Sequence, residues 1–198
     1  MFIFFMFLRS FLSEKSAMYV EIGVWKGATS IFMSRHSRST NVIGIDPFEL
    51  NHQHDEADAY RNALCGNGTI HWIKSYSSAA LPMLQQQLNG TMIDILFIDG
   101  AHDEKNVRID FELYSPLVSE GGFIVFDDFL DTEYSGGVRL MIMKLIDEGQ
   151  ISLDMYDVVG IVRNRGAGPV WVKDDFFYDW QALSSNEYVL RKRMAKNE

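Results

Sequence analysis

The stretch Tyr19-Val-Glu-Ile-Gly-Val-Trp-Lys-Gly-Ala-Thr-Ser30 decides the fold class of this chain. Its first part is apolar and β-branched, which predicts a strand, and the glycines that follow predict a turn leading into a helix. In open α/β sheets, ligands bind at the carboxyl ends of the strands. The turn after this strand is therefore predicted to face a ligand site.

Outward from this stretch, short apolar segments alternate with amphipathic ones. The predicted strands are Tyr19–Gly23, Asn41–Asp46, Thr69–Lys74, Ile93–Asp99 and Gly122–Asp127. The predicted helices are Ala28–Ser37, Glu56–Leu64, Ala79–Leu88 and Glu104–Val118. Strands that alternate with helices are typical of a parallel sheet covered on both faces. The sequence therefore predicts a doubly wound, Rossmann-like α/β fold.

The pattern changes after Asp128. A helix is predicted over Val138–Glu148, and two strands over Tyr156–Asn164 and Pro169–Lys173. The short link between these two strands predicts an antiparallel hairpin. We therefore expect five parallel strands plus a C-terminal antiparallel hairpin at the far edge of the sheet. The basic segment Gln181–Glu198 is expected to form a solvated helix.

The 198 residues suffice for one domain with a sizeable core and are few for two. We expect an N-terminal apolar extension over residues 1–17, one α/β domain over 18–175 and a tail over 176–198. The apolar run Met1–Leu8 is too short to cross a bilayer, which takes about 20 residues, so no stable membrane span is expected. A helix over Phe2–Lys15 that packs on the domain, or on a second copy in a homo-oligomer, is the favoured interpretation. An export signal and a wrongly assigned start codon are the alternatives.

Composition narrows the class of partner. Eighteen basic and 27 acidic side chains give a net charge of −9. Binding of nucleic acid usually takes a basic stripe that displaces counterions, so no nucleic-acid partner is expected. The single cysteine, Cys65, excludes a disulfide within the chain and a cysteine zinc site, which is typical of a reducing, cytoplasmic setting.

The glycine turn departs from the dinucleotide-binding fingerprint. That fingerprint, Gly-x-Gly-x-x-Gly/Ala, needs its second glycine so that the backbone can approach a pyrophosphate. Counted from Gly23, the second position is Trp25 and the third is Ala28. An indole at the second position opposes close phosphate contact, which counts against a nicotinamide-dependent oxidoreductase.

The turn resembles the first motif of the class I S-adenosylmethionine-dependent methyltransferases, an acidic residue, x, Gly, three residues and Gly. Glu21, Gly23 and Gly27 match it, and Asp46 at the end of the second predicted strand matches the carboxylate that accepts both ribose hydroxyls. The resemblance implies that S-adenosylmethionine is the cofactor. The residues expected to contact it are Glu21, Gly23, Trp25, Gly27, Asp46, Ser75, Tyr76 and Asp99.

Acidic residues gather at the ends of two other predicted strands. Asp99 ends the fourth strand, with His102 three residues later, and Asp127 and Asp128 end the fifth. Neighbouring strands lie about 4.8 Å apart, so these carboxylates would crowd one rim and raise one another's pKa unless a cation neutralises them. A hard divalent ion such as Mg²⁺ prefers such oxygen ligands, and a neutral histidine beside it can act as a general base. Turn capping by the aspartates is the alternative.

This second pattern is similar to the metal-dependent O-methyltransferases, in particular the branch with macrolide-sugar O-methyltransferases and cephalosporin-hydroxylase-like proteins. The resemblance covers Tyr19 to Phe129 and implies that Asp99, Asp127 and Asp128 hold the metal and that His102 is the base. The implied reaction is O-methylation of a hydroxyl on a small molecule or sugar. A non-catalytic S-adenosylmethionine-binding protein and a hydroxylase-like activity remain as alternatives.

Two loops are assigned from composition alone. Leu130–Gly137, which contains Tyr134 and two glycines, is predicted to be a lid on the acceptor side of the site. The polar segment His52–Glu56 has the spacing of a metal site but no apolar framework to fix it. We therefore expect it to be a solvated loop.

Overall fold

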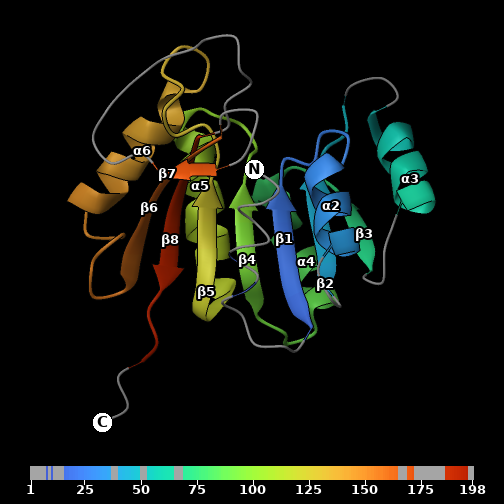
Figure 1. The fold of residues 1–198 in the computed structure, drawn as a ribbon, viewed down its shortest axis with the longest axis horizontal. Helices are drawn as coiled ribbons and strands as arrows, with labels where there is room; N and C mark the ends of the chain where they lie inside the picture. Colours follow the sequence, from blue (N-terminus) through green and yellow to red (C-terminus); the bar gives the residue numbers. More distant parts are fainter. Residues whose placement is uncertain are drawn as a thin grey trace.

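The computed structural model describes residues 8, 10, 16–36, 40–49, 53–64, 69–164, 169–171 and 186–195. Within these residues, eight strands form one sheet in the order β3-β2-β1-β4-β5-β8-β6-β7 (Figure 1). The strands are β1 (Ala17–Ile22), β2 (Thr40–Asp46), β3 (Ile70–Lys74), β4 (Ile93–Ile98), β5 (Val118–Phe126), β6 (Tyr156–Asn164), β7 (Pro169–Trp171) and β8 (Asn186–Lys192). The helices are α2 (Ala28–His36), α3 (Gln53–Leu64), α4 (Ser77–Leu88), α5 (Glu104–Tyr114), the 3₁₀ turn η1 (Ser115–Leu117) and α6 (Gly136–Asp147).

The order of the strands places the predicted site at a switch point. Strand β1 pairs in parallel with both β2 and β4, and β4 pairs in parallel with β5. Ile22 lies opposite Ile45 on one side and Ile98 on the other, and Ile98 lies opposite Phe126. The carboxyl ends of four strands therefore meet at one edge, where an open α/β sheet binds its ligands.

The core consists of two apolar layers, one on each face of the sheet. Alternate residues of a strand point to opposite faces, so Tyr19 packs in one layer while Val20 packs in the other. One layer receives Ile31 and Met33 of α2. The other receives the buried side chains of α4, α5 and α6, and Figure 1 shows α2 in front of the sheet with α4 and α5 behind it. Burial on both faces explains why every residue of β1 is buried, and confirms the doubly wound α/β prediction.

The five parallel strands and the hairpin of β6 and β7 are confirmed, but the predicted C-terminal helix is wrong over Asn186–Lys192. These residues form β8, which lies between β5 and β6 and runs antiparallel to both. Val189 and Leu190 are fully buried, and the nearby basic residue Lys192 donates to the carbonyl of Val118 at 2.8 Å. The charges of this segment favour a solvated helix, whereas its apolar centre forms an internal strand of the sheet.

Two other boundaries differ from the predictions. Helix α5 ends at Tyr114, before Pro116, and Val118 already belongs to β5, because proline cannot continue a helix. Helix α3 begins at Gln53, so the segment expected to be a loop up to Glu56 is helical where the structure describes it. The predicted N-terminal helix lies outside the described residues except for Leu8 and Ser10, which are helical. Leu8 is fully buried in the layer that contains α2.

Within the described part of the chain, no helix is both long and apolar enough to span a membrane.

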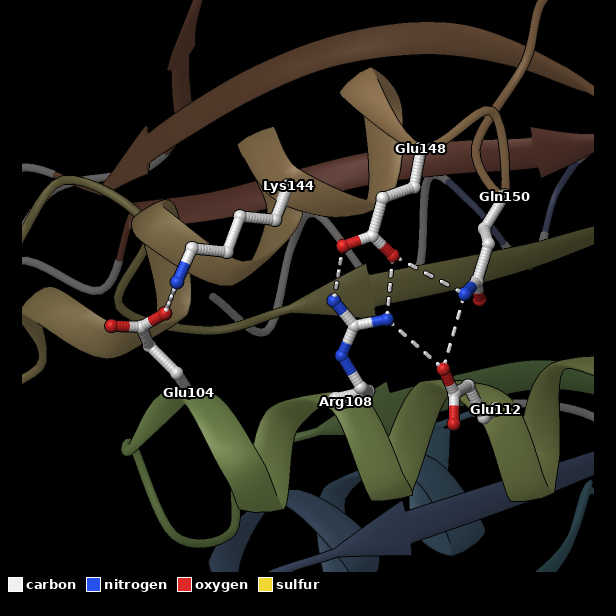
Figure 2. A network of polar contacts seen from close by, with 6 residues as sticks. All are labelled: Glu104, Arg108, Glu112, Lys144, Glu148 and Gln150. Carbon is white, nitrogen blue, oxygen red and sulfur yellow. Dashed lines mark hydrogen bonds and ion pairs between the residues drawn. The ribbon is translucent and has the colours of Figure 1, made fainter.

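An exposed ionic network joins α5 to α6 (Figure 2). Arg108 donates from both of its terminal nitrogens to Glu148, each at 2.7 Å, and also to Glu112 at 3.1 Å. Lys144 pairs with Glu104 one turn away, as Figure 2 shows. These ion pairs connect the two helices. The turns that precede the helices contain residues of the candidate site.

Candidate active site

The turn after β1 depends on a glycine. Gly23 has a φ of +87°, and a Cβ at this position would lie 1.9 Å from the carbonyl oxygen of Asp99. Two backbone hydrogen bonds join this turn to the neighbouring strands. Gly23 N–H donates to the carbonyl of Ile45 in β2 at 2.9 Å, and Asp99 N–H donates to the carbonyl of Ile22 in β1 at 2.8 Å. Only glycine allows the three strand ends to approach this closely.

Asp46 holds the same turn from the end of β2. Its Oδ2 accepts from the backbone N–H groups of Val24 at 2.9 Å and Trp25 at 3.0 Å, and its Oδ1 accepts from Phe48 N–H at 2.6 Å. Backbone donors therefore compensate much of the carboxylate charge. These three donors fix the orientation of the carboxylate at the end of β2.

A cleft of about 580 Å³ opens beside this turn, within the usual range for small-molecule sites. Its lining residues are Ile22, Gly23, Trp25, Ile45, Asp46, Pro47, Tyr76, Ser77, Ser78, Asp99, Gly100, Ala101, His102 and Asn106. The lining thus includes five of the predicted cofactor residues and the predicted base.

Three predicted cofactor residues lie outside this lining. The Glu21 carboxylate is buried and accepts hydrogen bonds from the hydroxyls of Ser30 and Tyr19, and burial raises its pKa to about 8. Gly27 has a φ of +79°, and a Cβ at this position would lie 3.3 Å from the Trp72 ring. The hydroxyl of Ser75 donates to the carbonyl of Tyr76.

The second half of the site is a cluster of acidic residues around His102. His102 Nε2 lies 3.5 Å from Asp99 Oδ1, and His102 Nδ1 lies 3.5 Å from Asp128 Oδ2. Ser135 Oγ lies 2.8 Å from His102 Nδ1 and donates to Asp128 Oδ2 at 3.0 Å. This pattern assigns Nδ1 as the donor to Ser135 and leaves Nε2 without a good hydrogen bond among the described residues.

The electrostatics of this cluster follow from crowding and burial. Burial raises the pKa of Asp99, and burial together with Asp99 and Asp128 raises the pKa of Asp127 well above its usual range. Contact with Asp99 raises the pKa of His102 despite its partial burial. In the absence of a metal, a proton on the imidazole therefore compensates part of the negative charge.

Three of these residues can hold a metal ion together. Asp99, His102 and Asp128 each offer one ligand atom, and these atoms lie within 4.8 Å of one another. Asp127, predicted as the third carboxylate ligand, lies behind this trio. Its Oδ1 accepts from the Asp128 N–H at 2.9 Å, and its residue is 7% exposed. The structure thus brings one ligand atom each of Asp99, His102 and Asp128 close together, while the prediction that Asp127 is a ligand stays a prediction.

Two residues of the cluster were not predicted. Ser135 is buried and precedes the Gly136–Gly137 pair that begins α6. The sequence signal that could have identified it is a serine directly before the start of a helix. Glu187 of β8 is fully buried, and its charge contributes to the raised pKa of Asp127. No local signal pointed to Glu187, because β8 pairs with β5 only in the folded chain. The predicted lid residue Tyr134 is 80% exposed next to Ser135.

Comparison with known proteins identifies the family. Residues 20–129, more than half of the chain, match the model of a methyltransferase domain, methyltransferase family 24. A relative, the uncharacterised protein R132 of Acanthamoeba polyphaga mimivirus, is 37% identical over 155 residues, which make up 74% of this chain and 68% of that protein.

Solved structures share the fold at low identity. The O-methyltransferase TomG from Streptomyces achromogenes, involved in tomaymycin synthesis and solved with S-adenosylmethionine, has a TM-score of 0.64 and 15% identity over 98% of this chain and 79% of that chain. An rRNA methylase from Streptococcus thermophilus has a TM-score of 0.66 and 10% identity over 97% of this chain and 95% of that chain. The chain therefore belongs to the methyltransferase-domain family 24, within the class I S-adenosylmethionine-dependent methyltransferases.

Proposed function

We propose that this methyltransferase transfers the methyl group of S-adenosylmethionine to a hydroxyl oxygen of a small molecule or sugar, with the help of a divalent metal ion such as Mg²⁺. The observation that carries the proposal is the cluster of Asp99, His102 and Asp128 beside the cleft that Gly23 and Asp46 shape. A class I cofactor cleft needs no acidic cluster to bind its cofactor. The cluster therefore indicates how the acceptor is activated.

The cleft fits the cofactor. When bound, S-adenosylmethionine supplies an electrophilic methyl group on a sulfonium. Asp46 would accept from a ribose hydroxyl, and Gly23 leaves room for the backbone to approach the ligand. The base would then extend toward the turns after β3 and β4, where Tyr76 to Ser78 and Gly100 to His102 line the cleft. Trp25, which is 58% exposed, would cover the open side.

The cluster fits a divalent metal. Asp99 and Asp128 would hold the ion with carboxylate oxygens, and His102 would lie next to it without coordinating it, while Asp127 orients the turn. Such an ion, when bound, lowers the pKa of a hydroxyl group that it contacts. His102 Nε2 would accept the hydroxyl proton. Because Asp99 and Asp128 favour the charged imidazolium, His102 is neutral and able to act as a base only when their charge is compensated.

A small acceptor suits the chain better than RNA. The rRNA methylase has the same fold, but the net charge of −9 here opposes binding to a polyanion. TomG, an O-methyltransferase in tomaymycin synthesis, provides the analogy for a small hydroxyl acceptor. Tyr134, exposed on the loop that supplies Ser135, would cover such an acceptor next to His102.

The proposal is tested by transfer of labelled methyl from S-adenosylmethionine to a panel of sugars and phenols, with Mg²⁺ or with a chelator. We expect transfer that the chelator abolishes, and a loss of about 10²-fold or more in kcat for Asp128→Asn and for His102→Ala. Both variants should bind S-adenosylhomocysteine as the wild type does. Asp154→Asn, an exposed aspartate away from the cleft, is the matched control and should have wild-type activity.

Each part of the proposal has its own refutation. Methyl transfer that persists undiminished in chelator would refute a role for the metal ion. Wild-type turnover by His102→Ala would refute the assignment of His102 as the general base. Binding of S-adenosylhomocysteine with no transfer to any acceptor would favour the alternative of a non-catalytic cofactor-binding protein.

A further inference from the structure

The start of α6 lies very close to the turn that carries His102. A Cβ at Gly137 would lie 2.4 Å from the carbonyl oxygen of His102 and 2.7 Å from the backbone nitrogen of Glu104. Both are backbone atoms, which cannot turn aside as the end of a side chain can. A Cβ at the preceding residue, Gly136, would have nothing within 4 Å. The close approach therefore requires glycine at position 137 and does not require it at position 136.

This approach places Ser135 against the imidazole of His102. Ser135 Oγ lies 2.8 Å from His102 Nδ1 and donates to Asp128 Oδ2 at 3.0 Å. The residue is 2% exposed, and its carbonyl accepts from the N–H of Val138 at 3.0 Å, which fixes the serine to the first turn of α6. The position of the serine beside the ring is therefore set by the position of α6.

The two carboxylates beside the ring do not distinguish its nitrogens. Asp99 Oδ1 lies 3.5 Å from Nε2, and Asp128 Oδ2 lies 3.5 Å from Nδ1. Both distances are long for an N–H···O hydrogen bond. The Ser135 hydroxyl has one proton, which Asp128 accepts, so its oxygen accepts the proton of Nδ1. In a neutral imidazole with a proton on Nδ1, the lone pair is on Nε2.

We infer that Ser135 is a positioning residue for methyl transfer: it holds the imidazole of His102 so that Nε2 accepts the hydroxyl proton of the methyl acceptor, and Gly137 gives α6 the space to keep the serine there. The inference rests on the proposed function for the role of His102. Nε2 is the ring nitrogen without a hydrogen-bond partner in the part of the chain that the structure describes, and His102 lines the cleft. Without the serine, the ring is free to turn its N–H toward Asp99.

The first test compares kcat in Ser135→Ala, in His102→Ala and in the double variant. The assay uses the sugar or phenol that the wild type methylates best, with saturating S-adenosylmethionine and Mg²⁺. We expect Ser135→Ala to lower kcat by about 10- to 30-fold and to leave the KM of the acceptor and the affinity for S-adenosylhomocysteine within about twofold. In the His102→Ala background, the same change should lower kcat by less than about twofold, because the serine acts through the imidazole.

Two matched controls accompany these variants. Gly137→Ala should lower kcat as Ser135→Ala does, whereas Gly136→Ala adds the same methyl group one residue earlier, in open space, and should keep the wild-type kcat. Ser34→Ala removes another buried hydroxyl, which donates to the Ile31 carbonyl at 3.1 Å in α2, and should also keep the wild-type kcat. If Gly137→Ala does not fold, Ser135→Ala still decides.

The second test needs neither cofactor nor metal. Thermal denaturation in chelator is measured for the wild type, Ser135→Ala, His102→Ala and the double variant. The two single variants remove the same hydrogen bond, so the loss of Tm in the double variant should be smaller than the sum of the two single losses.

Several outcomes would overturn the inference. Wild-type kcat in Ser135→Ala would do so, and so would additive losses of Tm. A further tenfold loss of kcat on adding Ser135→Ala to His102→Ala would show that the serine acts through another group, such as Asp128. Equal losses in Gly136→Ala and Gly137→Ala would refute the role of the close approach. A folded wild type that binds S-adenosylhomocysteine and methylates no acceptor would instead refute the proposed function, and this inference with it.

Discussion

The carboxylates at the two ends of the cleft have opposite electrostatic environments. Asp46 accepts three backbone N–H groups at distances of 2.6 to 3.0 Å. Asp99 and Asp128 face each other across His102 at 3.5 Å on each side, and Asp127 lies buried behind them. Protein donors thus stabilise the charge at one end, whereas the charges at the other end repel one another.

Under the proposed function, this difference separates cofactor binding at the Asp46 end from acceptor activation at the acidic cluster. Backbone donors fix Asp46, so the Asp46 end of the cleft is formed before a ligand arrives. The cluster at the other end depends on a proton or a cation to offset the charge of its carboxylates, and burial makes that charge more costly there. We therefore expect changes at the Asp46 end to affect cofactor affinity and changes in the acidic cluster to affect turnover.

The largest effect is expected from Gly23→Ala. A Cβ at 1.9 Å from the Asp99 carbonyl, with φ at +87°, would force the ends of β1 and β4 apart. We expect destabilisation by about 4 kcal/mol or more and loss of measurable S-adenosylhomocysteine binding, seen by thermal denaturation and calorimetry. Gly90→Ala is the control, since Gly90 has a φ of +83° and open space around it. It should cost about 1 kcal/mol and leave binding intact. Equal losses in both variants would show that backbone strain, and not the close approach, is the cause.

Asp46→Asn should weaken cofactor binding strongly without destroying the fold. An asparagine has one oxygen, so its amide group would face either the Val24 and Trp25 donors or the Phe48 donor. We expect affinity for S-adenosylhomocysteine to fall by roughly 30- to 100-fold, and stability by about 2 kcal/mol.

Asp94→Asn is the control for this variant. Asp94 also accepts from a backbone N–H, that of Met18 at 2.8 Å, but it lies on β4 at the opposite end of the sheet. The Asp94→Asn variant should be less stable than the wild type and should keep its affinity for S-adenosylhomocysteine. If both variants kept wild-type affinity, Asp46 would have no role beyond holding the turn.

The parts of this molecule that sequence could predict are those set by local pattern. Apolar runs and glycines predicted the positions of β1 to β5 along the chain, and strand ends predicted that Asp99, Asp127 and Asp128 share one edge. Glu187 and Ser135 could not be placed, because their positions depend on pairing and packing between segments distant in the chain. The charges that flank the short apolar centre of β8 favour a solvated helix when the sequence is considered locally, whereas pairing with β5 and β6 makes the segment a strand.

Glu21 shows the limit of motif matching. It occupies the acidic position of the motif, yet its carboxylate faces Ser30 and Tyr19 in the core. Its side chain follows from the alternation of β1, which points Glu21 and Tyr19 to the same face. The motif identifies the turn, while the geometry of the strand decides which residues of the motif line the cleft.

Glu21→Gln should therefore change stability with pH and leave cofactor affinity within about threefold of the wild type. The folded protein holds a proton on Glu21 up to a pKa of about 8, whereas the unfolded chain releases it near 4.5. The contribution of this group to stability is thus full below pH 4.5 and declines as the pH rises toward 8, by up to about 1.4 kcal/mol per pH unit. Denaturation from pH 5 to 8 in chelator should show a shallower decline for the variant. A large loss of affinity in Glu21→Gln would restore it as a cofactor residue.

The smallest effect is expected from Arg108→Ala, which removes the centre of the ionic network between α5 and α6 (Figure 2). The acidic partners of Arg108 are 42% and 45% exposed, so water and salt screen these pairs. Buried side chains of both helices, such as Val107 and Leu145, also belong to one apolar cluster, which the change leaves in place. We expect Tm to fall by about 2 °C at low salt and by less in about 0.5 M NaCl, with unchanged S-adenosylhomocysteine binding and methyl transfer. Because His102 and Ser135 precede these helices, a tenfold loss of transfer with intact cofactor binding would contradict this expectation. It would show that the acidic end of the cleft, unlike the Asp46 end, depends on contacts far from its own residues.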